Sequence, residues 1–247
     1  AKNNKLKQEL KEIVNNYLSN QEINLTNELS TRQKKLLEEI IIDYLQQIQG
    51  ETKEQLRELA EKCGLVSFKI NQLINSKQWW KKSEAAYILG ELGSKRAISV
   101  LLESLTAKNS DIKYQSALAI VKISGNEHLP VVINKLLKSD FYPREVILRL
   151  IEEVDADIYE TMERLITAED IEKRILALQS LGLKQDYRVL KWIKTYLQSS
   201  SPLLVEACLK AAYYIGDIGD SDYFQLLLTT KRDRKSTRLN SSHYRTS

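Results

Sequence analysis

Apolar residues recur along most of this chain at the spacing of one face of an α-helix. In each such segment they occupy positions i, i+3, i+4 and i+7, which lie on the same side of a helix. In the first third of the chain this pattern predicts four helices, over residues 5–18, 31–49, 53–63 and 66–76. Gly50 and Gly64 separate the last three, because glycine commonly ends a helix.

Downstream of residue 78, a short helical motif is repeated five times. Its copies begin at Ala85, Ser116, Val146, Ala177 and Ala211, so the successive steps are 31, 30, 31 and 34 residues. Each copy opens on small residues or an aliphatic substitute, and short side chains allow two helices to pack closely. A second apolar-periodic segment follows each copy, at residues 96–105, 129–137, 158–166, 187–197 and 222–228. The repeating unit is therefore a helix–turn–helix pair, which buries its apolar face only by stacking on its neighbours.

These patterns predict an all-α fold, an α–α superhelix of stacked helix pairs with an N-terminal helical capping region. Residues 1–77 form an N-terminal helical region of divergent repeats or a cap, and residues 78–232 an array of about five helix pairs. Residues 233–247 are assigned to an artefactual or disordered tail. No segment rich in Pro, Gly or Ser separates the first two parts, so we expect them to be continuous.

The repeats resemble HEAT-like repeats of the short kind, roughly thirty residues long, that also occurs in phycobilin lyases. The resemblance covers residues 78–228. In that family an Asp opens the first helix of a pair and an Arg follows a few residues later. Two such pairs are kept here at positions i and i+4, Asp140 with Arg144 and Asp170 with Arg174. The resemblance implies a curved helical solenoid in which these pairs have a structural role.

Composition supports a globular helical protein. The chain has 247 residues, of which 43% are hydrophobic and 28% are charged. With only 8 Gly and 3 Pro, it has too few turn-forming residues for a fold of many short strands. Its two cysteines, Cys63 and Cys208, are far apart, and it has only two histidines. This excludes a disulfide framework and a His-rich metal site, so we expect a cytoplasmic protein that uses no metal or cofactor.

The C-terminal residues change how the net charge of the chain is interpreted. The formal net charge is +4, but residues 233–247 carry four basic residues and one acidic residue, which leaves +1 for residues 1–232. Residues 233–247 also resemble the translation of a sequencing-library adapter. The net charge therefore gives no reason to expect nucleic acid as a partner.

The chain opens on Ala1 in place of an initiator methionine, which indicates a fragment. A lost upstream segment could hold an anchor that tethers the protein to the cytoplasmic face of a membrane. Within the sequence itself, no run of about eighteen apolar residues predicts a membrane span.

Residues 56–75 are the strongest candidate for a nucleic-acid-reading motif. Gly64 occupies the turn position of a helix-turn-helix, and the second helix is expected to point four polar side chains outward: Ser67, Lys69, Asn71 and Gln72. Asn and Gln can pair with adenine in the major groove. The alternative is a plain antiparallel helix pair, which is favoured because few basic residues flank the motif.

A second candidate is the aromatic pair Trp79 and Trp80, which Lys81 follows. A group of HEAT-like DNA glycosylases carries a Trp pair next to a catalytic Asp, but Lys81 takes the place of that acid here. The negative charge that the reaction needs is therefore missing. We expect one tryptophan to be wedged between helices and the other to be partly exposed.

No arrangement of residues predicts catalysis. Four acidic residues cluster near a turn, Glu152, Glu153, Asp155 and Asp157, but no glycine-centred loop of the calcium-binding kind surrounds them. Cys208 lies on a small-residue face and has no neighbouring His to activate it. We therefore expect a protein without enzymatic activity.

The remaining interpretation is a scaffold that binds a protein partner. In a superhelix of helix pairs the second helices form the concave face. The candidate surface there has mixed charge and consists of Ser99, Glu103, Asn134, Lys138, Glu160, Glu163, Lys191, Lys194 and Gln198. Mixed charge suits a protein better than a phosphate backbone, so nucleic acid is the less favoured partner. The alternatives are a nucleic-acid-binding protein that uses residues 56–75, and a lyase- or chaperone-like protein by analogy with phycobilin lyases.

Overall fold

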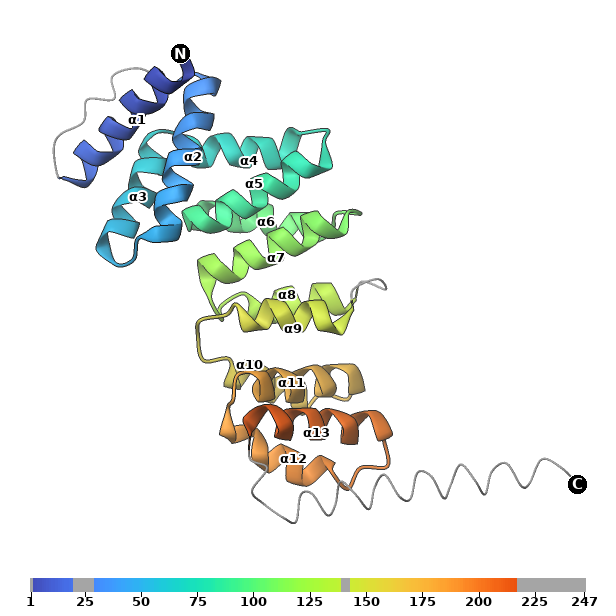
Figure 1. The fold of residues 1–247 in the computed structure, drawn as a ribbon. Coiled ribbons are helices and arrows are strands. Elements are labelled where there is room, and N and C mark those ends of the chain that lie inside the picture. Colours follow the sequence, from blue (N-terminus) through green and yellow to red (C-terminus); the bar gives the residue numbers. More distant parts are fainter. Residues whose placement is uncertain (1, 20–28, 139–142, 217–247) are drawn as a thin grey trace, which may run out of the picture. The chain divides into compact units, whose positions relative to one another are not determined.

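The computed structural model describes residues 2–19, 29–138 and 143–216 (Figure 1). Within these ranges the chain is all-α, with thirteen α-helices, two short 3₁₀ helices and no strand. The N-terminal helices are α1 (Lys2–Leu18), α2 (Thr31–Gln47), α3 (Glu51–Lys62) and α4 (Leu65–Asn75). The four helices predicted upstream of residue 78 are thus confirmed, with ends that differ by a few residues.

The helix pairs of the array follow in the predicted order. Their helices are α5 (Trp79–Leu92), η1 (Lys95–Ala97), α6 (Ile98–Ser104), α7 (Ser110–Ser124), α8 (Leu129–Leu137), α9 (Arg144–Glu152), α10 (Tyr159–Ile166), α11 (Ile171–Leu183), η2 (Tyr187–Val189), α12 (Leu190–Tyr196) and α13 (Pro202–Ile215). The odd-numbered helices from α5 to α13 are the first helices of their pairs, and α6, α8, α10 and α12 are second helices. The last predicted second helix, at residues 222–228, lies outside the described residues.

The chain divides into two compact units. Unit 1 comprises Ala1–Pro143 with Glu153–Asp155, and unit 2 comprises Arg144–Glu152 with Ala156–Ser247. Unit 1 therefore holds α1 to α8, and unit 2 holds α9 to α13.

In unit 1 each helix packs mainly on helices that are close to it in sequence. Helix α1 packs on α2 and α3, and α5 packs on α4, α2 and α7. Aliphatic side chains from these helices fill the core, among them Leu37, Ile41, Leu56, Leu89 and Ile120, all of them almost fully buried. Burial of such stripes stabilises each helix against its neighbours, since short helices are marginal in isolation.

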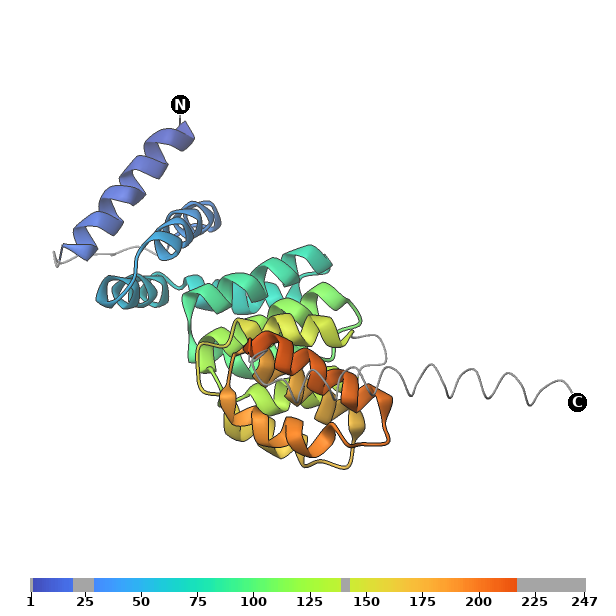
Figure 2. The same ribbon diagram turned by 60° about the horizontal axis from the view of Figure 1, so that its bottom comes forward.

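In unit 2 the first helices α9, α11 and α13 form one layer and α10 and α12 pack beside them. Helices α11 and α13 run side by side in both views (Figures 1 and 2). None of the described helices is both long and apolar enough to cross a membrane.

Small residues set the spacing of successive first helices, as the repeat motif predicts. A Cβ added to Gly90 on α5 would lie 2.8 Å from the Cα of Ala119 on α7, and one added to Gly182 on α11 would lie 2.5 Å from the Cα of Ala211 on α13. Both distances are too short for non-bonded carbons. The same glycine-over-alanine contact therefore occurs once in each unit.

Side-chain caps define several helix starts. Ser30 and Gln33 form a capping box at α2, and Asn109 accepts hydrogen bonds from the first backbone N–H groups of α7. Gly64 (φ 67°) and Gly93 (φ 67°) occupy left-handed positions between helices, where a side chain would be strained.

Candidate partner-binding surfaces

The candidate residues on the second helices of unit 2 lie at the surface. Glu160, Lys191, Lys194 and Gln198 are exposed, and Glu163 is half-buried. Glu163 on α10 and Lys191 on α12 form an ion pair, with 2.8 Å between Oε1 and Nζ. The mixed charge of this surface is thus partly compensated within the protein.

Arg188 of η2 makes a second connection between these helix pairs. Its guanidinium lies over the ring of Tyr159 at 4.2 Å from the centroid and donates to the carboxylates of Asp157 and Asp186, each at 2.7 Å. Tyr159 in turn donates its hydroxyl hydrogen to Glu163 at 2.9 Å. A continuous chain of contacts therefore joins the start of α10 to η2 and α12.

Charge pairing in this network shifts the pKa values of its members. The hydrogen bond from Arg188 lowers the pKa of Asp157, and those from Lys191 and Tyr159 lower the pKa of Glu163. Conversely, the pKa of Lys191 is raised, chiefly by Glu163, and that of Arg188 is raised, chiefly by Asp186. All of these groups stay charged around neutral pH.

Aromatic side chains continue the network along α12. Trp192 and Tyr196 are stacked, with 6.3 Å between ring centroids and planes at 15°. Lys191 lies over Trp192, and Arg174 from α11 lies over Tyr196. Sequence reasoning named Lys191 and Arg174 but missed Arg188 and the rings. The sequence offered one signal for this stretch: Arg188 is followed one turn later by Lys191, and aromatic residues lie beside them.

The candidate residues in unit 1 are also at the surface. Ser99 and Glu103 on α6 and Lys138 after α8 are exposed, and Asn134 on α8 is half-buried. In the part of the chain that the structure describes, none of these four side chains takes part in a hydrogen bond or ion pair. Their polar groups are therefore free for a partner.

Of the two Asp–Arg pairs of the repeat pattern, the first falls partly outside the described residues, because Asp140 is not among them. Arg144 forms an ion pair with Glu172 of the next first helix at 2.5 Å. Asp170 is the N-cap of α11, as the resemblance implies, and accepts from the Glu172 backbone N–H. Arg174 donates to the carbonyl of Ala168 at 2.5 Å rather than to Asp170.

Of the predicted polar face of the helix-turn-helix-like segment 56–75, three residues lie at the surface: Ser67 and Asn71 are exposed and Gln72 is half-buried. Lys69 was expected to point outward, and this is wrong: it is only 2% exposed, and its Nζ lies 2.7 Å from Oε1 of Glu38 on α2. Val66, Lys69 and Leu73 form one buried stripe of α4, and Glu38 of α2 reaches Lys69 in this stripe. Loss of solvent raises the pKa of Glu38, and Lys69 partly offsets this rise.

The other polar residues of that face have partners within unit 1. Ser67 accepts from Arg96, Asn71 accepts from Asn75, and Gln72 donates to Glu84. With its one basic residue buried, α4 itself contributes no exposed positive charge of the kind that a DNA-reading helix uses to approach phosphates.

Both tryptophans of the pair lie at the surface and are about half exposed. Trp79 and Trp80 are 48% and 52% exposed, so the expectation that one is wedged between helices is wrong. They occupy the first turn of α5, whereas the buried stripe of this helix begins at Ala85. The two rings meet edge to face, with 6.1 Å between centroids and planes at 89°.

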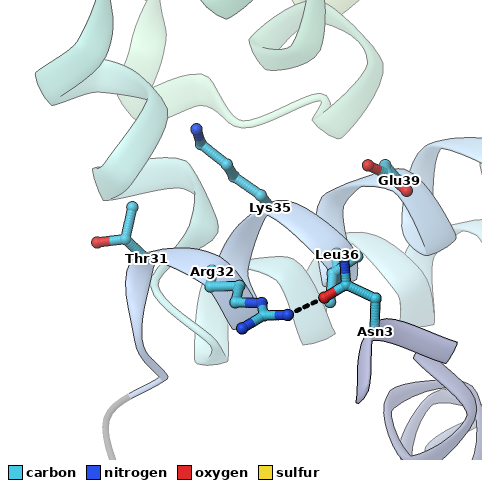
Figure 3. A pocket seen from close by; sticks show the side chains of 6 residues that line it. All are labelled: Asn3, Thr31, Arg32, Lys35, Leu36 and Glu39. Atoms are coloured by element: carbon cyan, nitrogen blue, oxygen red, sulfur yellow. Dashed lines mark hydrogen bonds between the residues drawn. The ribbon is translucent and has the colours of Figure 1, made fainter. Parts of the chain in front are cut away.

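Two open cavities lie along α2. One, of about 440 Å³, is bordered by Asn3 on α1 and by residues of α2, and Arg32 donates a hydrogen bond to Asn3 across it (Figure 3). Lys35 points away from Asn3 in this view. Lys35 also lines the second cavity, of about 330 Å³, with Thr31, Phe68, Asn71, Gln72 and Lys81.

The cysteines are packing residues. Cys63 and Cys208 are buried, and burial raises their pKa values to about 11 and about 12, which keeps both thiols protonated and poorly nucleophilic. Among the described residues, no group of three or more His, Cys, Asp or Glu side chains could hold a metal ion.

The described part of the chain is thus an all-α repeat structure in which antiparallel helix pairs follow one another. A family model described as HEAT repeats matches residues 67–152. This match and the consecutive helix pairs support a HEAT-like repeat protein.

One similar solved structure is the crystal structure of an engineered protein from a structural genomics consortium; it is 18% identical, with a TM-score of 0.39 over 83% of this chain and 96% of the other. No curated protein matches the sequence.

Proposed function

We propose that this protein is a non-enzymatic scaffold that binds a protein partner on the face formed by its second helices. HEAT repeats commonly act as protein-interaction scaffolds. The observation that carries the proposal is that all nine predicted surface residues are exposed or half-buried, on α6, α8, α10 and α12 or just beyond their ends.

The chemistry of this face favours a protein partner. Its charges alternate in sign, and in unit 2 Glu163 and Lys191 already compensate each other. Tyr159 and Trp192 supply aromatic surface beside them, and aromatic residues are common at the centre of protein interfaces. Lys194, like Lys138, is exposed and has no ion-pair partner among the described residues, so it can bind a carboxylate of the partner.

Site-specific photo-crosslinking tests the proposal. A photoreactive residue placed at Glu103, Glu160 or Lys194 should crosslink to one protein in cell extract, whereas the same residue at Arg149 should not. Arg149 is the matched control, because it is basic and not buried but lies on the first helix α9. Crosslinks from Arg149 to the same protein would contradict the proposal.

Binding of the captured partner to charge-reversal variants gives the second test. Lys194→Glu should weaken binding by about tenfold or more, and Arg149→Glu should leave it unchanged. If the protein binds duplex DNA in place of a protein partner, and its affinity for DNA falls steeply as the salt concentration rises, the nucleic-acid alternative is supported.

A further inference from the structure

Exposed apolar side chains are concentrated where α4 ends and α5 begins, in unit 1. Ile74 is 50% exposed, Trp79 48% and Trp80 52%. These are three of the nine large hydrophobic residues that are exposed in the described part of the chain, and they fall within seven successive positions. Such a local cluster commonly marks an interaction site, and tryptophan is the residue type most enriched at binding hot spots.

This apolar cluster is held in a defined position. Lys82 on α5 donates a hydrogen bond to the carbonyl of Ile74 at 2.8 Å, which ties the end of α4 to the first turns of α5. In the connection, the backbone N–H of Gln78 donates to the hydroxyl of Ser76 at 3.2 Å. The tryptophan rings are thus presented from an ordered corner, which lowers the entropic cost of binding.

Three lysines that form no ion pair within the described part of the chain lie near the cluster. Lys77 and Lys81 lie beside the tryptophans in sequence, and Lys81 lies with Lys35 on the 330 Å³ cavity between α2, α4 and α5. None of these three lysines forms an ion pair with a described residue. Glu84, the acidic residue on this part of α5, accepts a hydrogen bond from Gln72 at 3.5 Å.

The cavity and the apolar cluster belong to one surface. Asn71 lines the cavity, and Ile74 lies three positions later on the same helix, which makes the two neighbours on its surface. Lys81 lines the cavity and directly follows Trp80 in α5. Because Asn75 donates to the side-chain carbonyl of Asn71, the amide N–H₂ of Asn71 remains available as a donor beside the lysines.

We propose that this α4–α5 corner, formed by Ile74, Trp79, Trp80, Lys35, Lys77 and Lys81, binds an acidic protein segment that carries an apolar side chain. The apolar side chain packs on the tryptophans, and a carboxylate of the same segment binds Lys35 and Lys81 at the cavity. The corner is a second site, which shares no residue with the second-helix face.

The geometry favours a peptide over a nucleic acid. Successive bases stack on the faces of aromatic rings, but here one tryptophan edge points at the face of the other, at 89°. Ile74 offers an aliphatic contact, which has no counterpart in base stacking. The basic residue that would extend the charge along α4, Lys69, is buried with Glu38.

Selection of a random-peptide phage library on the whole protein tests the proposal. Depletion on a W79A/W80A variant removes peptides that bind elsewhere. The selected peptides should share acidic residues next to an aromatic or aliphatic residue. Selection of basic or uncharged peptides, or of none that depends on the tryptophan pair, would overturn the proposal.

Titration of a selected peptide then separates the two halves of the surface. Binding to K35E/K81E is followed by tryptophan fluorescence. Binding to W79A/W80A is followed by fluorescence anisotropy of a labelled peptide. Each double variant should weaken binding by about tenfold or more. Tyr187→Ala is the matched control, because Tyr187 is 62% exposed on unit 2 and should not affect affinity. Circular dichroism must show that every variant keeps its helical content and unfolding midpoint.

Two further titrations distinguish the α4–α5 corner from the second-helix face and from a nucleic-acid site. Lys194→Glu should leave peptide affinity unchanged, so a failure of the second-helix proposal would not affect this result. A single-stranded oligonucleotide is titrated in parallel. If it binds with strong salt dependence and W79A/W80A abolishes that binding, the corner is a nucleic-acid site and the peptide proposal is wrong.

Discussion

At the scale of single residues, the most consequential feature is the ion pair between Lys69 and Glu38. Both side chains are buried, and their attraction across 2.7 Å offsets part of the cost of removing two charges from water. One carboxylate oxygen of Glu38 has no hydrogen-bond partner. Loss of one partner should therefore be far more harmful than loss of both.

Lys69→Met is expected to destabilise the protein by about 3–5 kcal/mol at neutral pH, because it leaves the Glu38 carboxylate buried without a counter-charge. The double variant Glu38→Leu/Lys69→Met should regain most of this loss. Urea unfolding followed by circular dichroism measures both. A single variant as stable as the wild type would show that Glu38 reaches solvent.

The same variant should respond to pH in a definite direction. Burial raises the pKa of Glu38 in the folded protein, and removal of Lys69 raises it further. Folding then takes up a proton, so stability is highest below the unfolded-state pKa and falls as pH rises through the folded-state pKa. Thermal midpoints of Lys69→Met should therefore increase relative to the wild type as the solution is acidified.

At the scale of helices, two kinds of contact join one repeat to the next. First helices approach closely where glycine meets alanine, at Gly90 with Ala119 and at Gly182 with Ala211. In unit 2, α10 and α12 are joined through polar groups, of which Glu163 and Lys191 are examples. Stability in such arrays comes mainly from contacts between neighbouring repeats, so these positions determine whether the helices stack.

Gly90→Ala is expected to destabilise the protein by about 1–3 kcal/mol, because the new methyl group forces α5 and α7 apart. Intrinsic helix propensity alone would make this substitution favourable, since alanine is the better helix former. Ser99→Ala, at an exposed helical position, serves as the control and should have little effect. An increase in the unfolding midpoint of Gly90→Ala would mean that the helices separate without cost.

Lys191→Met should raise the pKa of Glu163 toward its ordinary value, because Lys191 is the main cause of its lowering. Carbon-detected NMR titration of the side-chain carboxyl measures this directly. Asp157 is the internal control: Arg188 lowers its pKa, so it should titrate as in the wild type. The stabilisation from Glu163 is present above its unfolded-state pKa and is lost as pH falls through its folded-state pKa.

At the scale of the whole chain, the same packing solution appears in both units. Each contains first helices in close glycine–alanine contact and second helices with exposed polar residues. The interpretation of residues 233–247 as an artefactual tail predicts that they add nothing to this packing. Their deletion should leave the thermal midpoint unchanged in calorimetry, and a clear decrease would show that the segment docks on the folded repeats.

The sequence by itself determined which segments are helical and that they recur in pairs. Apolar periodicity and small residues are local signals, because they follow from the number of residues per turn and from side-chain size. The burial of Ala85, Ala86 and Cys208 on close-packed helix faces could be predicted in this way, as could the turn at Gly64.

Only the tertiary structure decided what covers each face. Lys69 is polar and was assigned to solvent, but it is buried and pairs with Glu38 of α2, about thirty positions earlier in the chain. Trp79 and Trp80 are apolar and one of them was expected to be covered, yet about half of each side chain stays open to solvent at the first turn of α5. Periodicity tells which residues share a side of a helix, whereas the neighbour that buries, pairs or exposes them comes from distant sequence.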